Sequence, residues 1–180
     1  MINKLLLCIL FTLTLVFGVT YEDGKRAFEK EDYKKALKIF EEVSLKTKDF
    51  DHYELGYIYL NGEALEEGLP QDTEKAFSYF NDSAYRGNVL AMLALASNFD
   101  LGFFVERDYL EAKKFYEKAA IKGNCLAQYT LGSYYEEGKE GIETDIEKAI
   151  KWYKMACYNK KVSNQDFFKD MACERLKIYE

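Results

Sequence analysis

The side chains that most often carry out chemistry in enzymes are few in this sequence, and their spacing does not bring them together. His52 is the only histidine, so no second imidazole exists for a catalytic or metal-binding pair. Cys125, Cys157 and Cys173 lack the Cys-x-x-Cys spacing of zinc and thioredoxin-like sites. Neither Gly-x-Ser-x-Gly nor Ser-x-x-Lys is present, and no glycine-rich phosphate loop occurs. We therefore predict a protein without catalytic residues, cofactor or bound metal.

The composition is that of a folded, acidic domain. Of 180 residues, 48% are hydrophobic and 31% charged, the net charge is −6, and Pro70 is the only proline. A chain so poor in proline leaves room for many uninterrupted helices. Because no stripe of lysine and arginine interrupts the acidic background, we expect no nucleic-acid partner.

The first twenty residues have the layout of a secretory signal peptide. A weakly positive start precedes residues 5–19, which are apolar apart from two threonines and one glycine, and charged sequence begins at Tyr21. Cleavage after Gly18 or Thr20 would start the mature chain at Val19 or Tyr21. The alternative is an uncleaved anchor, but the apolar run falls short of the ~20 residues that a bilayer needs. We expect a secreted or periplasmic protein whose only membrane contact would be an uncleaved signal segment.

Internal repeats account for most of the remaining sequence. Four segments share an alanine followed by aromatic residues, and their alanines lie 40, 36 and 37 residues apart. These segments are Lys35–Phe40, Lys75–Phe80, Glu111–Tyr116 and Lys148–Tyr153.

A second pattern, Leu-small-x-x-aromatic-x-x-Gly, precedes each of the last three segments. Its copies are Leu55–Gly62, Leu95–Gly102 and Leu131–Gly138. Residues three and four apart share one face of a helix, and the small residue would let a neighbouring helix approach closely. The final glycine fits a helix C-cap with positive φ. Each unit is predicted to be a helix, a loop and a helix, and the units are predicted to stack.

Together these patterns resemble the SEL-one-like repeat, a relative of the tetratricopeptide repeat. The most complete copy spans residues 127–156 and includes the loop aspartate Asp145, whereas residues 24–36 resemble an ordinary tetratricopeptide repeat. The resemblance implies an all-α fold, a right-handed α-solenoid of stacked antiparallel helix hairpins. The implied segments are a signal peptide (1–20), a tetratricopeptide-like hairpin (21–50), three repeats (51–87, 88–123 and 124–160) and a C-terminal capping helix (161–180).

The sequence departs from the family pattern at three places. Ala96 stands where glycine is usual, and the loop at 63–71 is longer than the others. The usual Gly-x-Gly-Val loop becomes Gly102-Phe103-Phe104-Val105, and we expect it to expose two aromatic side chains.

The cysteines resemble those of the secreted, cysteine-rich subset of this family. In that subset a cysteine at the end of one repeat bonds to a cysteine in the next helix, and Cys157 and Cys173 each follow an alanine as in that pattern. The resemblance implies a Cys157–Cys173 disulfide, in a loop longer than the family's. Cys125 is the alternative partner of Cys157, since the start of one helix of a hairpin lies near the end of the other. The odd number of cysteines outside the signal segment leaves one thiol reduced or paired with another chain.

The similarity to tetratricopeptide repeats also implies a concave face lined by the first helix of each unit, where a partner would bind. For Tyr53 and Tyr129, packing between helices is the alternative interpretation. The positions expected on this face are Lys25, Phe28, Tyr53, Tyr57, Asn61, Ser97, Asp100, Tyr129, Ser133, Glu136 and Glu137.

We predict that the protein is a scaffold that binds a protein or peptide through this face. A tyrosine-lined groove with acidic ends would suit a peptide or helix that carries basic residues. Some cysteine-rich members are described as penicillin-binding or β-lactamase-like, but the absence of Ser-x-x-Lys argues against a serine mechanism. A third possibility is a purely structural component of the cell envelope, which would have no discrete partner.

Overall fold

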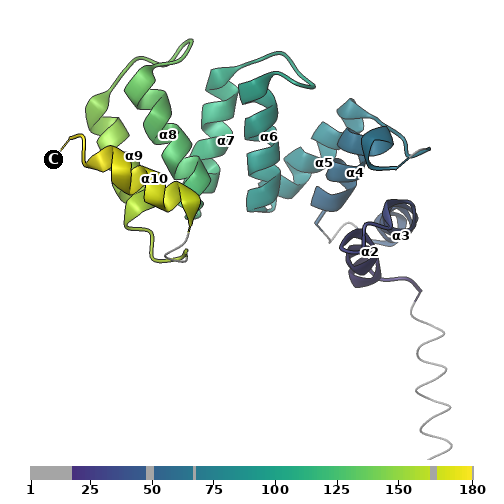
Figure 1. The fold of residues 1–180 in the computed structure, drawn as a ribbon. Coiled ribbons are helices and arrows are strands. Elements are labelled where there is room, and N and C mark those ends of the chain that lie inside the picture. The colour runs from purple at the N-terminus through teal and green to yellow at the C-terminus, as the bar shows by residue number, and fades with distance from the viewer. Residues whose placement is uncertain (1–17, 48–50, 67, 163–165, 180) are drawn as a thin grey trace, which may run out of the picture. The chain divides into compact units, whose positions relative to one another are not determined.

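The computed structural model describes residues 18–47, 51–66, 68–162 and 166–179, so most of the predicted signal segment lies outside the described residues. The described chain is built from helices, and its only strand-like pairing is an isolated bridge between Lys139 and Ile142. The all-α prediction is therefore confirmed. The helices are α2 (Tyr21–Phe28), α3 (Tyr33–Lys46), α4 (Tyr53–Leu65), α5 (Thr73–Tyr85), α6 (Val89–Leu101), α7 (Tyr109–Ile121), α8 (Cys125–Glu137), α9 (Ile146–Cys157) and α10 (Phe167–Leu176) (Figure 1).

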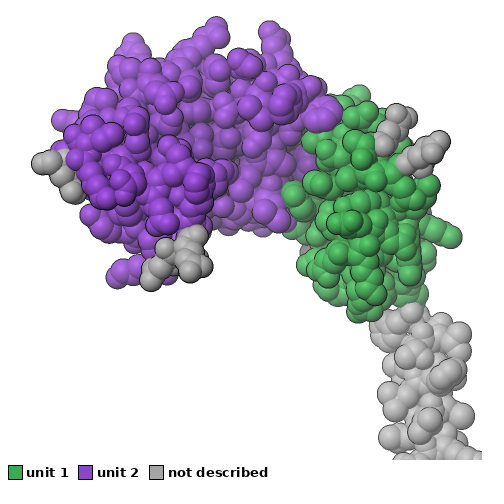
Figure 2. Space-filling model, in the orientation of Figure 1, with its two compact units in different colours: residues 1–79 green, residues 80–180 purple. Residues whose placement is uncertain are grey.

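Two compact units divide the chain, residues 1–79 and residues 80–180 (Figure 2). In the first unit α2 packs on α3, and α3 contacts α4. In the second unit α6 packs on α7, α7 on α8 and α8 on α9, and α10 packs on both α8 and α9. None of the described helices is both long and apolar enough to cross a membrane.

The repeated alanines lie in the cores of the hairpins. The four alanines of the first pattern are fully buried: Ala36, Ala76, Ala112 and Ala149. The leucines of the second pattern are almost as inaccessible: Leu55, Leu95 and Leu131. Because the alanine side chain is only a methyl group, two helix backbones can approach closely at these positions. The pattern therefore determines which face of each helix is buried.

An aspartate in each loop closes the hairpin of the last three repeats. The backbone N–H groups of Asp72, Asp108 and Asp145 donate to the carbonyl oxygens of the motif aromatics Tyr59, Phe99 and Tyr135, over 2.8, 2.9 and 2.7 Å. Each aspartate side chain then accepts from the first-turn amides of the following helix, as an N-cap does. One residue thus joins the end of the first helix to the start of the second.

The predicted glycine C-caps are present in two of the three repeats. Gly102 and Gly138 end α6 and α8 with φ of 69° and 75°. The prediction is wrong for Gly62, which lies inside α4 with φ 3° and ψ −93° and kinks the helix. A Cβ at Gly62 would lie 2.3 Å from the carbonyl oxygen of Pro70. The longer loop runs back against the helix here, so close approach of the two backbones requires the glycine.

Candidate functional site

The expected binding residues of the first unit form an aromatic cluster on α2 and α4. Phe28 of α2 packs edge-on against Tyr33 at 5.5 Å and Tyr57 at 5.4 Å between ring centroids. Tyr53 lies 6.4 Å from Tyr57 on the same helix. All of these rings are half-buried, so each combines packing with an accessible edge.

Polar groups of the same unit flank this cluster. Lys25 is half-buried with its ammonium 5.9 Å from the Tyr21 ring, and the Tyr21 hydroxyl donates to Glu54 over 2.9 Å. Asn61 donates from Nδ2 to the carbonyl oxygen of Tyr57, one turn earlier in α4. Burial raises the pKa of Tyr53, with smaller contributions from Tyr57 and Glu54. The cluster therefore presents neutral hydroxyls and an amide beside apolar rings.

In the second unit the expected residues lie on α6 and α8, and several of them are already engaged. Tyr129 packs 5.6 Å from Tyr153 of α9 and 6.0 Å from Phe168 of α10, so its ring fills the space between helices. Ser133 donates to Glu137 over 3.0 Å. Glu137 also pairs with Lys139 over 3.0 Å, which chiefly holds the pKa of its carboxyl below the usual range.

Two tyrosine–carboxylate pairs recur one repeat apart. Tyr116 of α7 donates to Asp100 of α6 over 3.2 Å, and Tyr153 of α9 donates to Glu136 of α8 over 2.7 Å. The pairs occupy equivalent repeat positions, because each carboxylate comes four residues after the small residue of its motif. Burial, with Asp100 nearby, raises the pKa of Tyr116 to about 12. Asp100 and Glu136 thus join the two helices of their own hairpins.

Glu136 also anchors the final helix. Arg175 of α10 donates to its Oε2 from Nη2 over 2.6 Å and from Nε over 3.1 Å, and the Tyr179 hydroxyl donates to Oε1. The Glu136 side chain is only 11% exposed. Burial raises the pKa of its carboxyl, but donation from Tyr179, Tyr153 and Arg175 outweighs burial and leaves the pKa below its usual range. Although the sequence analysis expected Glu136 to meet a partner, its carboxylate holds three helices together.

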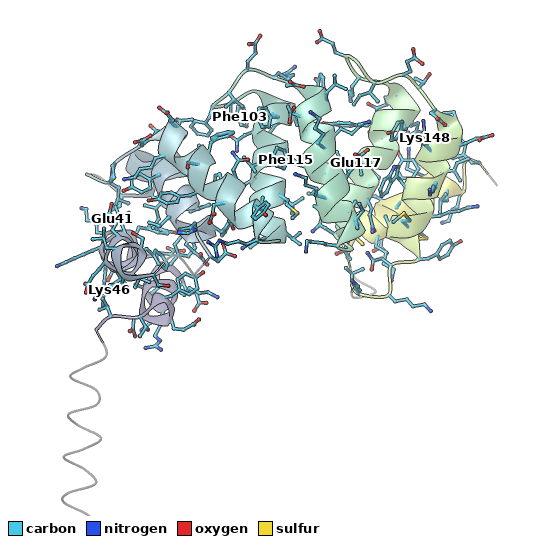
Figure 3. The ribbon with its side chains drawn as sticks, turned by 180° about the vertical axis from the view of Figure 1, so that it is seen from behind. Glu41, Lys46, Phe103, Phe115, Glu117 and Lys148 are labelled. Carbon is cyan, nitrogen blue, oxygen red and sulfur yellow. A yellow bond between two sulfur atoms is a disulfide. The ribbon has the colours of Figure 1, made fainter. Side chains whose placement is uncertain are left out.

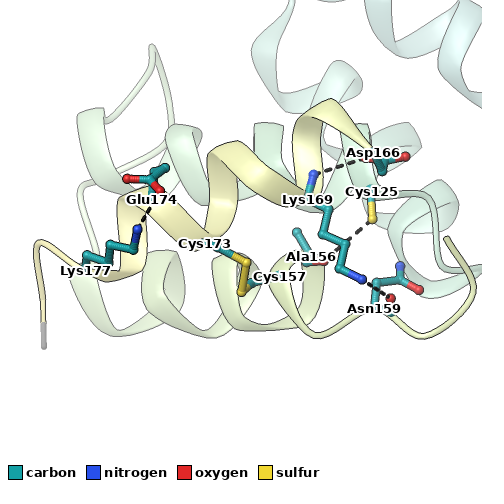
Figure 4. Close-up of a disulfide and its surroundings, with 9 residues drawn as sticks. All are labelled: Cys125, Ala156, Cys157, Asn159, Asp166, Lys169, Cys173, Glu174 and Lys177. Carbon is teal, nitrogen blue, oxygen red and sulfur yellow. Dashed lines mark hydrogen bonds and ion pairs between the residues drawn. A yellow bond between two sulfur atoms is a disulfide. The ribbon is translucent and has the colours of Figure 1, made fainter. Parts of the chain in front are cut away.

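The structure joins Cys157 at the end of α9 to Cys173 of α10 in a disulfide, with 4.8 Å between the Cα atoms (Figure 4). This is the pair that the family resemblance implied. Cys125 is free and buried at the start of α8, and its Sγ donates to the carbonyl oxygen of Ala156 over 3.6 Å. Burial raises the pKa of the Cys125 thiol, which keeps it protonated at neutral pH.

No group of three potential metal ligands occurs within the described part of the chain. His52, at the start of α4, stacks on Tyr79 with 5.5 Å between ring centroids. Its contact is thus with an aromatic ring, as suits a residue at the start of a helix.

The family model for the Sel1 repeat matches residues 18–42, 51–88, 89–124 and 125–160, which is most of the chain. The chain belongs to the Sel1 repeat family. Proteins of this family generally act as scaffolds that bind other proteins. The membership agrees with the all-α repeat solenoid described above.

A curated relative is the chitin synthase regulator SKT5 of Saccharomyces cerevisiae, which is 37% identical over 107 residues. The match covers 58% of this Sel1 repeat chain and 15% of the relative, so the chain spans a small part of that regulator's length.

Three solved structures share the fold. A Sel1 repeat protein from Oxalobacter formigenes has a TM-score of 0.58 and 29% identity, and the match covers 87% of this chain and 96% of that one. The protective antigen c5321 of uropathogenic Escherichia coli has a TM-score of 0.60 and 26% identity, with 80% and 28% covered. Cysteine-rich protein B of Helicobacter pylori, at 20% identity and a TM-score of 0.52 with 88% and 98% covered, shows the fold alone.

Sequence reasoning missed the structural role of Glu136, although a signal for its pairing with Tyr153 was present. Four residues after the repeated alanine, the second helix carries Tyr116 in one repeat and Tyr153 in the next, and the first helix carries a carboxylate at the paired position. In the other two repeats the second helix carries phenylalanine at this place, and the paired position of the first helix is apolar. The apolar cases pair Phe40 with Phe28 and Phe80 with Leu60. This alternation indicates that a carboxylate at this position is a partner for tyrosine.

We expect Glu136→Gln to lower the free energy of unfolding by about 1–2 kcal/mol at pH 7, because the neutral amide loses the charge-assisted hydrogen bonds to Arg175. The loss is no larger because Arg175 is partly exposed and solvent weakens its bonds to Glu136. The folded-state pKa of Glu136 is depressed, so its contribution is present above the unfolded pKa of about 4.3 and is lost as pH falls through the folded pKa. Urea denaturation between pH 3 and 7 should therefore show a smaller acid-induced loss in the variant.

Glu137→Gln is the matched control for this experiment. Its side chain is 53% exposed, and its pair with Lys139 lies at the surface. We expect a change within about 0.5 kcal/mol. Equal losses in the two variants would contradict the anchoring role of Glu136.

Proposed function

We propose that this Sel1 repeat protein is an exported scaffold that binds a protein or peptide partner through the first helices of its repeats. The observation that carries the proposal is the half-buried aromatic and polar surface on α2 and α4, formed by Phe28, Tyr53, Tyr57 and Asn61. Partly buried tyrosines that keep a polar edge are typical anchors in protein interfaces.

The first helices of the second unit carry a smaller set of accessible residues. Ser97 and Ser133 are half-buried on α6 and α8, and Glu137 is exposed. Glu136 and Asp100 are used within the hairpins, and Tyr129 within the helix packing. A partner would therefore find its aromatic anchors on the first unit.

Export is supported by the apolar segment at the N-terminus and by the disulfide, since such bonds persist in oxidising compartments. Thr20 forms a capping box with Asp23 at the start of α2. Cleavage after Gly18 would keep this cap, whereas cleavage after Thr20 would remove it. We place the mature N-terminus at Val19; intact Met1 in protein from the extracellular or envelope fraction would contradict cleavage.

Site-specific photocrosslinking tests the binding surface. A benzoyl-phenylalanine at Tyr53 or Tyr57 should capture the same partner from a native envelope extract, because both positions lie on the first helix α4. The control positions Lys118 and Lys151 are exposed on the second helices α7 and α9 and should not capture it. Tyr57→Ala should weaken recovery by about tenfold or more, as expected when an aromatic anchor is truncated.

Equal capture from first-helix and second-helix positions would contradict the proposed surface. Absence of any discrete product would instead favour a purely structural role. Turnover of nitrocefin by the purified protein would contradict a non-catalytic scaffold. Circular dichroism of Tyr57→Ala would show whether its loss of binding reflects unfolding.

A further inference from the structure

A groove separate from the first-helix surface lies between two loops of the second unit. The α6–α7 loop and the α8–α9 loop lie at the same edge of this unit (Figure 1). They enclose a hollow of about 650 Å³. Its lining residues are Phe99, Val105, Glu106, Arg107, Asp108, Tyr109, Leu110, Glu140 and Gly141.

The floor of this loop groove is apolar and partly open. Leu110, at the start of α7, is 45% exposed, and its side chain meets the opposite loop, because a Cβ at Gly141 would lie 3.1 Å from Leu110 Cδ1. Val105 and Tyr109 add half-buried surface. Next to Val105 in the chain, Phe103 and Phe104 are exposed, Phe103 by 73% (Figure 3). Apolar side chains that stay exposed beside a hollow, as Leu110 does here, are typical of interaction sites.

Two cations lie at or next to the groove: Arg107 lines it, and Lys139 precedes the lining residue Glu140 in the chain. Arg107 donates from Nη2 to the Leu101 carbonyl oxygen over 3.3 Å and from Nη1 to the Tyr109 hydroxyl over 3.4 Å. Lys139 pairs with Glu137 over 3.0 Å. Arg107 keeps its positive charge, because both of its acceptors are neutral, and it offsets one of the three lining carboxylates, whereas the charge of Lys139 is balanced by Glu137.

The carboxylates of the groove are, by contrast, available. Asp108 caps α7 through Oδ1, but Glu106 and Glu140 are exposed, and within the described residues neither makes an ion pair. Three carboxylates against one cation leave the lining with a net negative charge, so the groove combines an apolar floor with an acidic rim. A complementary occupant carries positive charge around an apolar side chain.

We propose that this loop groove is a second docking site, which binds a polypeptide segment with an apolar anchor side chain flanked by lysine or arginine. The anchor lies on Leu110 and Val105, and the flanking cations face Glu106 and Glu140. The site is independent of the first-helix surface, so a partner can bind to either one alone.

Two synthetic peptides test the loop groove on the full-length mature protein. One carries a phenylalanine flanked by two lysines on each side, and the other has glutamate in place of every lysine. Binding is followed by fluorescence anisotropy and by amide chemical shifts. The lysine peptide should bind saturably and shift residues 103–110 and 138–143, and the glutamate peptide should not bind.

Two groove variants test the contribution of the carboxylates and that of the apolar residue Leu110 separately. Glu106→Gln/Glu140→Gln should weaken lysine-peptide binding about fivefold and reduce its salt dependence. Leu110→Ser should weaken it about tenfold. Glu74→Gln/Asp170→Asn removes the same charge from exposed positions on α5 and α10 and should leave binding unchanged. Thermal melts identify any variant that fails to fold, and the wild-type shift map decides the case without variants.

Three results would each overturn the proposal: no saturable shift with the lysine peptide, shifts confined to α4, α6 or α8, or equal affinity for the two peptides. Unchanged binding by both groove variants would do the same. Loss of partner capture at Tyr57 has no bearing on these readouts, so failure of the first-helix surface and failure of the groove are distinguishable.

Discussion

Replacing Gly132 by alanine is expected to lower the free energy of unfolding by about 3 kcal/mol. A Cβ at this position would lie 2.5 Å from Cε1 and 2.6 Å from Cδ1 of Tyr153. The Tyr153 ring is fully buried, and its hydroxyl is tied to Glu136 over 2.7 Å. Because the clash is with the body of a fixed ring, relief requires α8 and α9 to separate. Alanine is the better helix former by about 1 kcal/mol, and the steric cost exceeds that gain.

The chain contains its own control at the equivalent position of the preceding repeat. Ala96 occupies this place in α6 and is fully buried, and the tyrosine of the same hairpin is Tyr116 of α7. Ala96→Gly should cost only about 1 kcal/mol, chiefly through helix propensity. Urea denaturation followed by circular dichroism measures both variants.

A double-mutant cycle identifies the clash itself. Tyr153→Leu removes the ring, so adding Gly132→Ala to that variant should cost much less than adding it to the wild-type protein. A Gly132→Ala variant as stable as the wild type, or strict additivity with Tyr153→Leu, would contradict the close approach of these two helices.

The sequence was a good guide to this core because its contacts are local and repeated. The buried alanines Ala36, Ala76, Ala112 and Ala149 follow from spacing on a helix face, and each hairpin brings together residues about twenty positions apart. Gly62 was misread because its neighbour is the backbone at Pro70, in a loop whose path no helical period describes.

The binding residues were harder to predict because exposure depends on partners far along the chain. Glu136 has the spacing of a surface position, but Arg175 lies 39 residues later and covers it. The loop groove combines Phe99 and residues 105–110 with Glu140 and Gly141, which come from two different repeats. Periodicity predicts which face of a helix is buried, and it does not predict how two loops meet.

Removal of the Cys157–Cys173 disulfide is expected to destabilise the C-terminal helix by about 3 kcal/mol. The bond closes a loop with a sequence separation of 16. In the chain-entropy model, closing a loop of this length lowers the entropy of the unfolded chain, which stabilises the folded state by about 3 kcal/mol. Because α10 packs chiefly on α8 and α9 among the described helices, the loss should be local to it. The Glu136–Arg175 contacts remain, so α10 should fray without detaching completely.

Hydrogen exchange of Cys157→Ser/Cys173→Ser locates this loss. Amides of α10 should exchange about a hundredfold faster, which corresponds to about 3 kcal/mol, while those of α6 and α7 should be unchanged. Cys125→Ala is the control, since it removes a thiol and leaves the disulfide in place. Adding a reductant should reproduce the effect in the wild type and have none in the double-serine variant.

Non-reducing peptide mapping of the protein from its native compartment tests the pairing on which this prediction depends. It should recover a Cys157–Cys173 peptide and a free Cys125, because the Cys125 thiol is buried and its raised pKa keeps it in the unreactive protonated form. A Cys125–Cys157 peptide, or three free thiols, would contradict the assignment. In either case α10 would be held by its packing on α8 and α9 and by its contacts with Glu136, and Glu136→Gln would then loosen it further.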